Sequence, residues 1–256
     1  MASFCVATFN VGSLYANIDV AYPLLQKVIS QYRPHVLCMQ ELPMEKALID
    51  DLCQWGEYPF VVTKTTSKSH VNIGEDMGLA IFSRFPMGKP TFLHLHKPDR
   101  EIFYKGKQEF WHDKLYMSVP LLLNSHTPAS QIRVITGHGF PFHRYGLEKP
   151  EEAQLISPSL AQIDQWVSEF LQQDPAVPVV IAADFNLSDP TAYMPQSRQT
   201  LADVFYHQAT RPSGRKTDAI FLPDNAEIGQ RVNWISPKEN EKFVFDHNFI
   251  AAHWIL

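Results

Sequence analysis

Several polar side chains stand at the ends of apolar runs in this sequence, where a strand can hold a side chain rigidly and leave it open to solvent. They are Asn10, Glu41, Asp184, Asn186, Asp246 and His247. One such residue on its own usually forms a cap or a turn. Six of them in one chain favour a shared chemical site.

The donor atoms of these residues indicate a hard metal ion and a phosphoryl group. Carboxylate and amide oxygens are the ligands that Mg²⁺ and Mn²⁺ prefer, so Glu41, Asp246 and the amide oxygen of Asn10 predict a divalent cation. Asp184 and Asn186 are two residues apart, and an extended chain would point both to the same side. A carboxylate beside an amide suits a water molecule and a phosphoryl oxygen.

An imidazole completes this set of groups. The ordinary pKa of histidine lies near 6.5, so His247 can exchange protons around neutrality if a carboxylate orients its ring. Asp218, within Lys216-Thr217-Asp218-Ala219-Ile220-Phe221, is the candidate partner. The sequence therefore predicts a pair formed by His247 and Asp218.

The same residues carry a family resemblance, because short motifs occur in a fixed order over nearly the whole chain. The motifs are Thr8-Phe9-Asn10, Gln40-Glu41, Gly137-His138, Ala183-Asp184-Phe185-Asn186, Thr217-Asp218-Ala219-Ile220-Phe221 and Asp246-His247. The chain resembles the endonuclease/exonuclease/phosphatase superfamily, which contains DNase I-like nucleases, exonuclease III-like apurinic endonucleases, deadenylases and inositol phosphatases. The resemblance implies an α+β fold, a four-layer α/β/β/α sandwich in which two mixed sheets pack face to face with helices outside.

Carried over to this sequence, the resemblance implies a metal centre. Glu41 would be the principal ligand of Mg²⁺ or Mn²⁺, with Asn10 beside it. Asp246 would lie near the cation or at a second metal position. The metal would offset the negative charge of the transition state and lower the pKa of bound water or stabilise the leaving oxygen.

The resemblance also implies roles in the reaction. Asp184 would align or deprotonate the attacking water, while Asn186 and His138 would hold nonbridging phosphate oxygens. His247, paired with Asp218, would transfer a proton or stabilise the phosphate. The expected reaction is hydrolysis of a phosphoester, and the sequence favours a phosphodiesterase or nuclease that acts on DNA or RNA.

Alternative functions are a phosphomonoesterase or a small-molecule phosphodiesterase of the same superfamily, and less favoured are a noncatalytic binding member and a zinc hydrolase. The zinc interpretation depends on His94-Leu95-His96-Lys97-Pro98-Asp99, whose spacing departs from the metallo-β-lactamase pattern. Where many superfamily members have glycine and serine, this chain has Ala183 and Phe245. The segment around Asp218 lacks the Trp-Cys-Asp-Arg pattern, which disfavours the inositol polyphosphate phosphatases.

Substrate contacts are predicted directly after His138. His143 and Arg144 could bind a flanking phosphate, and Tyr145 could stack on a base or ring. The alternative is a tight turn whose aromatic rings fill the core. The irregular segment 96–113 could likewise be a long hairpin loop that contacts substrate or a solvated connector.

Composition limits the class of protein. The chain has 256 residues, 22 Lys and Arg against 27 Asp and Glu, a net charge of -5 and 45% hydrophobic residues. These values are typical of a globular protein and argue against strong sequence-independent adhesion to nucleic acid, although a local basic groove stays open. No apolar run reaches the ~20 residues of a membrane span, and no signal peptide is evident. Three cysteines favour a cytoplasmic location, and no protein partner can be inferred.

Short β-branched or aromatic runs predict about ten strands, interrupted by three helical patterns. The strands are expected at Phe4–Asn10, Val36–Gln40, Pro59–Thr63, Leu79–Ser83, Thr91–Leu95, Tyr116–Leu123, Ile132–Gly137, Val177–Ala182, Asp218–Leu222 and Asn248–Trp254. The helices are expected near Tyr22–Gln31, Met44–Gln54 and Glu151–Gln172. No linker or repeat divides the chain, so residues 1–256 are expected to form a single catalytic domain.

Overall fold

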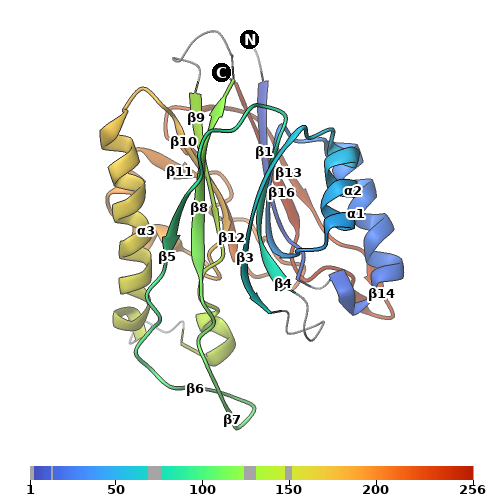
Figure 1. Cartoon of the computed structure of the whole chain (residues 1–256). Helices are drawn as coiled ribbons and strands as arrows, with labels where there is room; N and C mark the ends of the chain where they lie inside the picture. Colours follow the sequence, from blue (N-terminus) through green and yellow to red (C-terminus); the bar gives the residue numbers. More distant parts are fainter. Residues whose placement is uncertain (1–2, 13, 69–75, 124–130, 148–151, 256) are drawn as a thin grey trace.

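Two six-stranded sheets pack face to face in the computed structural model, which describes residues 3–12, 14–68, 76–123, 131–147 and 152–255 (Figure 1). The first sheet has the order β13 (Glu227–Trp234), β16 (Phe249–Ile255), β1 (Ser3–Asn10), β2 (Val36–Pro43), β4 (Asp76–Ser83), β3 (Phe60–Lys68). The second has the order β11 (Leu201–Asp203), β12 (Asp218–Pro223), β10 (Val179–Asp184), β9 (Gln131–Gly137), β8 (Leu115–Leu122), β5 (Thr91–His94). Both sheets are mixed, because β1 and β2 are parallel, as are β9 and β10, among otherwise antiparallel neighbours.

Helices cover the outer faces of both sheets. Helices α1 (Ile18–Tyr32) and α2 (Lys46–Gly56) bury their apolar faces against the first sheet, and α3 (Ala153–Gln173) covers the second (Figure 1). In α3, Ile156, Leu160 and Ile163 recur at helical spacing and are buried in that layer. The arrangement confirms the expected α/β/β/α sandwich.

The central layer between the sheets explains the uninterrupted apolar runs of the sequence. In β1, Val6 packs into the layer between the sheets, whereas Ala7 and Phe9 face the helices. A strand buried on both faces reads as a continuous apolar run rather than an alternating one. The polar residue that ends such a run is therefore held by a rigid strand.

Several strand ends meet at one end of the sandwich. The parallel strands β1 and β2 place Asn10 beside Gln40, one residue before Glu41. In the second sheet, Asp184 at the end of β10 pairs in register with Asp218 at the start of β12. The topology thus gathers residues that are far apart in the sequence.

Short elements complete the described part of the chain. They are the 3₁₀ helices η1 (Leu14–Ala16), η2 (Phe142–Tyr145), η4 (Pro190–Tyr193) and η5 (Ser197–Gln199), and the hairpins β6 (Ile102–Tyr104) with β7 (Lys107–Glu109) and β14 (Lys238–Glu239) with β15 (Lys242–Phe243). The hairpin β6–β7 projects beyond the two sheets at one end of the molecule (Figure 1). It lies within segment 96–113, for which the sequence left open a long hairpin loop or a solvated connector.

Each of the ten expected strands overlaps an observed strand, and the three expected helices are observed, although residue 151 lies outside the described residues. Strand β13 was not predicted, because it is an exposed edge strand whose register shifts between Ile228 and Gln230. Such a strand lacks a long apolar run. Within the described residues, no helix combines the length and the hydropathy of a bilayer-spanning segment.

Candidate active site

Glu41 owes its direction to an irregularity in β2. The register between β2 and β4 shifts between Met39 and Leu42, and Glu41 has a φ of 50°. A positive φ is uncommon outside glycine, and such strained positions cluster at functional sites. Gly12 lies directly against this side chain, since a Cβ atom there would be 2.1 Å from Oε2 of Glu41. A side chain at position 12 would therefore displace the carboxylate of Glu41 from its present place.

Asn10 links Glu41 to the second sheet. Its Nδ2 donates to Oδ2 of Asp184 at 2.8 Å and lies 3.4 Å from Oε1 of Glu41, while its Oδ1 accepts from the backbone N–H of Gly12 at 2.9 Å. The amide thus lies between two carboxylates that belong to different sheets. The predicted role of Asn10 as a metal ligand stays a prediction.

Asp184 and Asn186 do not share an extended strand, and that expectation was wrong. Strand β10 ends at Asp184, and Asn186 adopts a φ of 55°. The turn lets the backbone N–H of Asn186 donate to Oδ1 of Asp184 at 2.8 Å, while its Nδ2 donates to the carbonyl of Gly139 at 3.1 Å. Both side chains nevertheless lie at the gathered strand ends.

His138 lies between the two carboxylates and a lysine. Its Nε2 is 3.4 Å from Oε1 of Glu41 and 3.6 Å from Oδ2 of Asp184, and its Nδ1 is 3.0 Å from Nζ of Lys114. Burial lowers the pKa of Lys114, although the charges of Glu41 and Asp184 oppose this effect. The site therefore contains a desolvated cation close to its carboxylates.

Lys114 was not among the residues predicted from the sequence. It lies directly before β8, which runs antiparallel to β9, so the start of β8 meets the end of β9 near His138. Most residues predicted for the site end an apolar run, whereas Lys114 precedes one. Its place directly before an antiparallel strand is the signal that identifies it.

His247 lies against both aspartates. Its Nδ1 is 3.0 Å from Oδ2 of Asp218, the predicted partner, and its Nε2 is 3.8 Å from Oδ2 of Asp184. Burial by itself lowers the pKa of His247, but the carboxylates of Asp218, Asp184 and Asp246 together raise it to about 9. The imidazole is therefore protonated at neutral pH.

The pKa of Asp184 is also raised. Burial and then the charge of Asp218 raise its pKa from 3.8 to about 6, against the influence of His247 and Asn10. A buried carboxylate with a raised pKa is typical of functional sites. Asp184 is therefore mostly ionised at neutral pH, with a larger protonated fraction than an ordinary aspartate would have there.

The donors present fit a divalent cation. Glu41 and Asp184 offer hard carboxylate oxygens on either side of His138, and Asp184, Asp218 and His247 offer ligand atoms within 4.8 Å of one another. Buried carboxylates repel one another without a compensating positive charge. Oxygen-rich donors of this type suit Mg²⁺ or Mn²⁺ better than soft metals.

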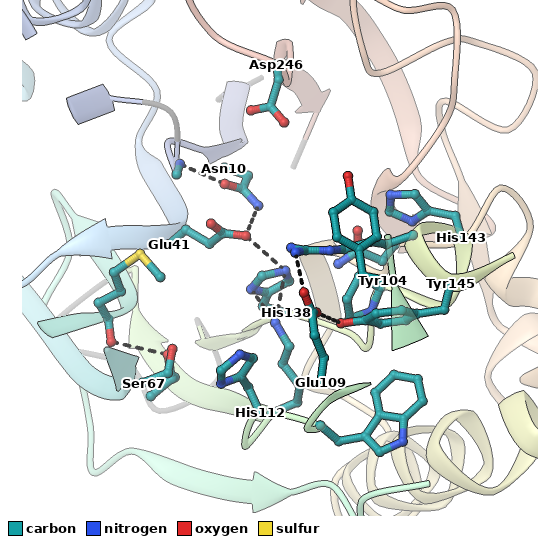
Figure 2. Close-up of a pocket in the computed structure, with 18 of the residues that line it drawn as sticks. Asn10, Glu41, Ser67, Tyr104, Glu109, His112, His138, His143, Tyr145 and Asp246 are labelled. Carbon is teal, nitrogen blue, oxygen red and sulfur yellow. Dashed lines mark hydrogen bonds and ion pairs between the residues drawn. The ribbon is translucent and has the colours of Figure 1, made fainter. Parts of the chain in front are cut away.

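Asp246 lies at the edge of this cluster, where an arginine pairs with it. Its Oδ2 pairs with Arg211, its side chain is 55% exposed, and Nε2 of His247 lies 4.0 Å away. In Figure 2, the carboxylate of Asp246 points toward the side of the cavity that carries Asn10 and Glu41. Its predicted place near the cation or a second metal stays a prediction.

A cavity of about 830 Å³ opens onto these residues. One wall comes from the ends of β3 and β4, including Ser67, and the opposite wall comes from hairpin β6–β7 and η2. In Figure 2, Glu41 and Asn10 lie on one side and Tyr104, Glu109 and Tyr145 on the other. The site therefore has room for groups on two sides of a bound phosphate.

All three predicted substrate contacts line this cavity. Arg144 Nη2 forms an ion pair with Oε1 of Glu109 at 3.1 Å, and the hydroxyl of Tyr145 donates to Oε2 of the same carboxylate at 2.9 Å. Burial and the neighbouring Arg211 and Arg215 lower the pKa of His143 to about 4, so its ring is neutral. Whether these residues touch substrate stays a prediction.

Comparison with known proteins places the chain in a family. The profile of the Endonuclease/Exonuclease/phosphatase family matches residues 7–233. The chain belongs to this family. No curated protein sequence matches it significantly. As a member of the Endonuclease/Exonuclease/phosphatase family it is a hydrolase of phosphoesters, which confirms the resemblance seen in the sequence.

Solved structures share the fold of this family member at low sequence identity. The human Nocturnin catalytic domain with bound sulfate has a TM-score of 0.72 at 15% identity, and the match covers 99% of this chain and 93% of that one. ANGEL2, a 2′,3′-cyclic phosphatase, has a TM-score of 0.70 at 15% identity, and the match covers 98% of this chain and 95% of that one. The mannosyl-6-phosphatase Bt3783 of Bacteroides thetaiotaomicron has a TM-score of 0.66 at 15% identity, and the match covers 99% of this chain and 100% of that one.

Proposed function

We propose that this protein is a divalent-metal-dependent phosphodiesterase that hydrolyses phosphodiester bonds of nucleic acid. The observation that carries the proposal is the contact of His247, which lines a cavity with two separate walls, with the buried carboxylates of Asp218 and Asp184. A phosphodiester carries a group on each ester arm, and the two walls offer a surface for each.

In this mechanism, Asp184 aligns a water molecule and accepts its proton. The ionised carboxylate suits this role because its pKa of about 6 lies near the working pH. The water oxygen forms a bond to phosphorus in line with the leaving oxygen, whose bond to phosphorus breaks. Hydrolysis thus yields one alcohol and one phosphate monoester.

Other side chains act on the phosphate itself. Protonated His247, held by Asp218, stabilises the phosphate or donates a proton to the leaving oxygen. His138, Lys114 and Asn186 hold the nonbridging oxygens through hydrogen bonds to anionic oxygen. Glu41 would hold Mg²⁺ or Mn²⁺ with Asn10 beside it, and the bound metal would supply charge neutralisation.

A phosphomonoesterase is the second candidate, because three cations that line the cavity form ion pairs with carboxylates and are less available to a long nucleic acid. Arg144 pairs with Glu109, Arg211 with Asp246, and Lys68 with Asp76. Extended nucleic acid binds through many unpaired cations, and such contacts are reduced here. The similar structure Bt3783 is a mannosyl-6-phosphatase.

An activity panel distinguishes the candidates. Single-stranded DNA, RNA, abasic-site duplex, plasmid and small phosphate monoesters are incubated with Mg²⁺ or Mn²⁺, with a chelator as control. The proposal expects cleaved strands that carry a terminal phosphate. Release of inorganic phosphate from small monoesters, with all nucleic acids intact, would favour the second candidate.

The free cysteines Cys5, Cys38 and Cys53 agree with the proposed cytoplasmic location.

A further inference from the structure

The wall formed by hairpin β6–β7 presents an aromatic ring to the cavity. Phe110 directly follows β7, lines the cavity and is 78% exposed. Its neighbour Trp111 is buried, donates from Nε1 to the carbonyl of Arg100 at 2.8 Å and packs its ring against Phe140 at 5.4 Å. The anchor at Trp111 therefore fixes the backbone position from which Phe110 lines the cavity.

The same wall is held together by a network of side chains. Glu109 accepts hydrogen bonds from Arg144 at 3.1 Å and from Tyr145 at 2.9 Å, and the guanidinium of Arg144 lies 4.4 Å from the ring centroid of Tyr104. Figure 2 shows Tyr104, Glu109 and Tyr145 grouped on this side. Because these contacts already order the wall, a ligand that binds there loses little free energy in immobilising side chains.

The chemistry of this wall favours a flat ring over a further phosphate. Arg144, the cation of the wall, is paired with Glu109, and a phenyl ring offers no hydrogen bond or charge to a phosphate. Aromatic side chains bind single-stranded nucleic acid by stacking on its bases, with little preference among them. Bases within a duplex are already stacked and are unavailable to an external ring.

We propose that Phe110 is a specificity-determining residue that stacks on an unpaired nucleobase, or a comparable flat ring, beside the scissile phosphodiester. The inference rests on the proposed function and deepens it. It assigns the substrate class to single-stranded or short nucleotide phosphodiesters. Phe110 contributes to binding of the ring, whereas the reaction itself belongs to the residues around Asp184.

Two matched dinucleotides test this role. One is thymidylyl-(3′→5′)-thymidine, and the other has the same sugars and phosphodiester but hydrogen in place of both bases. In Phe110→Ala, we expect kcat/KM for the dinucleotide with bases to fall roughly tenfold, as expected for loss of one base stack, and the base-free compound to change less than about twofold. The control is Phe103→Ala, because Phe103 is 56% exposed on the same hairpin but does not line the cavity.

The role of Phe110 would be overturned if Phe110→Ala lowered kcat/KM equally for both compounds or did not lower it at all. It would also be overturned if Phe103→Ala lowered kcat/KM as much as Phe110→Ala. If the wild type hydrolyses neither compound, the proposed function fails for this substrate class. The two compounds are then stable, and isothermal titration calorimetry decides the inference separately. Tighter binding of the dinucleotide with bases, weakened roughly tenfold by Phe110→Ala, would support it. Equal binding of the two compounds, or binding of neither, would overturn it.

Discussion

The Nδ1 atom of His247 lies 3.0 Å from Oδ2 of Asp218, although 29 residues separate them along the chain. The hydroxyl of Thr217 also donates to this carboxylate oxygen at 3.0 Å. Asp218 is therefore held in place at the start of β12, and its charge faces the imidazole. Both groups are buried, so their electrostatic interaction is weakly screened by solvent.

This contact predicts a pH-dependent stability of the metal-free protein. The pKa of His247 is raised from 6.5 to about 9. Its protonated form stabilises the fold fully below pH 6.5, and this contribution is lost as the pH rises through about 9. With a chelator present, the free energy of unfolding should fall over this window, by about 3 kcal/mol. Urea denaturation at several pH values measures it.

The matched variant for this prediction is His247→Gln, which keeps a polar side chain but cannot titrate. Its stability should change less between pH 6.5 and 9 than that of the wild type. Asp184 titrates near pH 6, below most of this window. An identical pH profile in the variant would show that His247 is not the titrating group.

Substitution of Asp184 or His247 should abolish most activity without unfolding the chain. Asp184→Asn keeps the shape of the side chain, but it cannot take a proton from water, and its single oxygen can accept from only one of the two donors, Asn10 and Asn186, that now bond to different oxygens. We expect kcat to fall by at least about 10²-fold, and the same for His247→Ala. Steady-state kinetics and circular dichroism check the two parts of this expectation. Wild-type rates in either variant would contradict the assigned roles.

Lys114 should contribute to binding of the phosphate. A hydrogen bond to a charged group contributes about 1.5–3 kcal/mol, so Lys114→Met should lower kcat/KM by roughly 10- to 100-fold. The control is Lys97→Met, because Lys97 pairs with Asp113 at the surface and is 50% exposed. If both variants lose the same activity, the effect reflects general charge rather than a contact at the site.

Metal binding should stabilise the wild type more than a variant of its principal ligand. At a Mg²⁺ or Mn²⁺ concentration about 100 times the dissociation constant, mass action adds about 2.7 kcal/mol to the free energy of unfolding. Glu41→Gln should show a much smaller gain, while Glu169→Gln, an exposed change on α3, should behave as the wild type does. Thermal denaturation with and without the ion measures the difference. If the metal stabilised Glu41→Gln as much as the wild type, Glu41 would not be a ligand of the metal.

A buried ion pair outside the cavity predicts a purely structural effect. Nζ of Lys216 lies 2.6 Å from Oδ2 of Asp203, and the two side chains are 7% and 1% exposed. Lys216→Met leaves a buried carboxylate unpaired and should destabilise the fold by about 3–5 kcal/mol. Lys46→Met breaks an exposed pair on α2 and should cost about 0–1 kcal/mol. Similar denaturation midpoints for the two variants would contradict this expectation.

The strands and the family could be predicted from the sequence because both depend on local patterns. Continuous apolar runs such as Val179–Asp184 reflect burial on both faces of a strand, and the polar residues that end the runs recur in a fixed order. The family resemblance carried by those polar residues implied the α/β/β/α sandwich. Their placement also predicted that Glu41, Asp184 and His247 belong to one region, which is where the structure places them.

Only the tertiary structure decided the directions and partners of the side chains. The φ of Glu41 depends on the irregular pairing of β2 with β4, and the proximity of Lys114 to His138 depends on the pairing of β8 with β9. Asn10 and Asp184 hydrogen-bond across 174 residues of chain. Sequence patterns report the periodicity of burial, whereas rotamers and long-range contacts are fixed only when separate elements pack together.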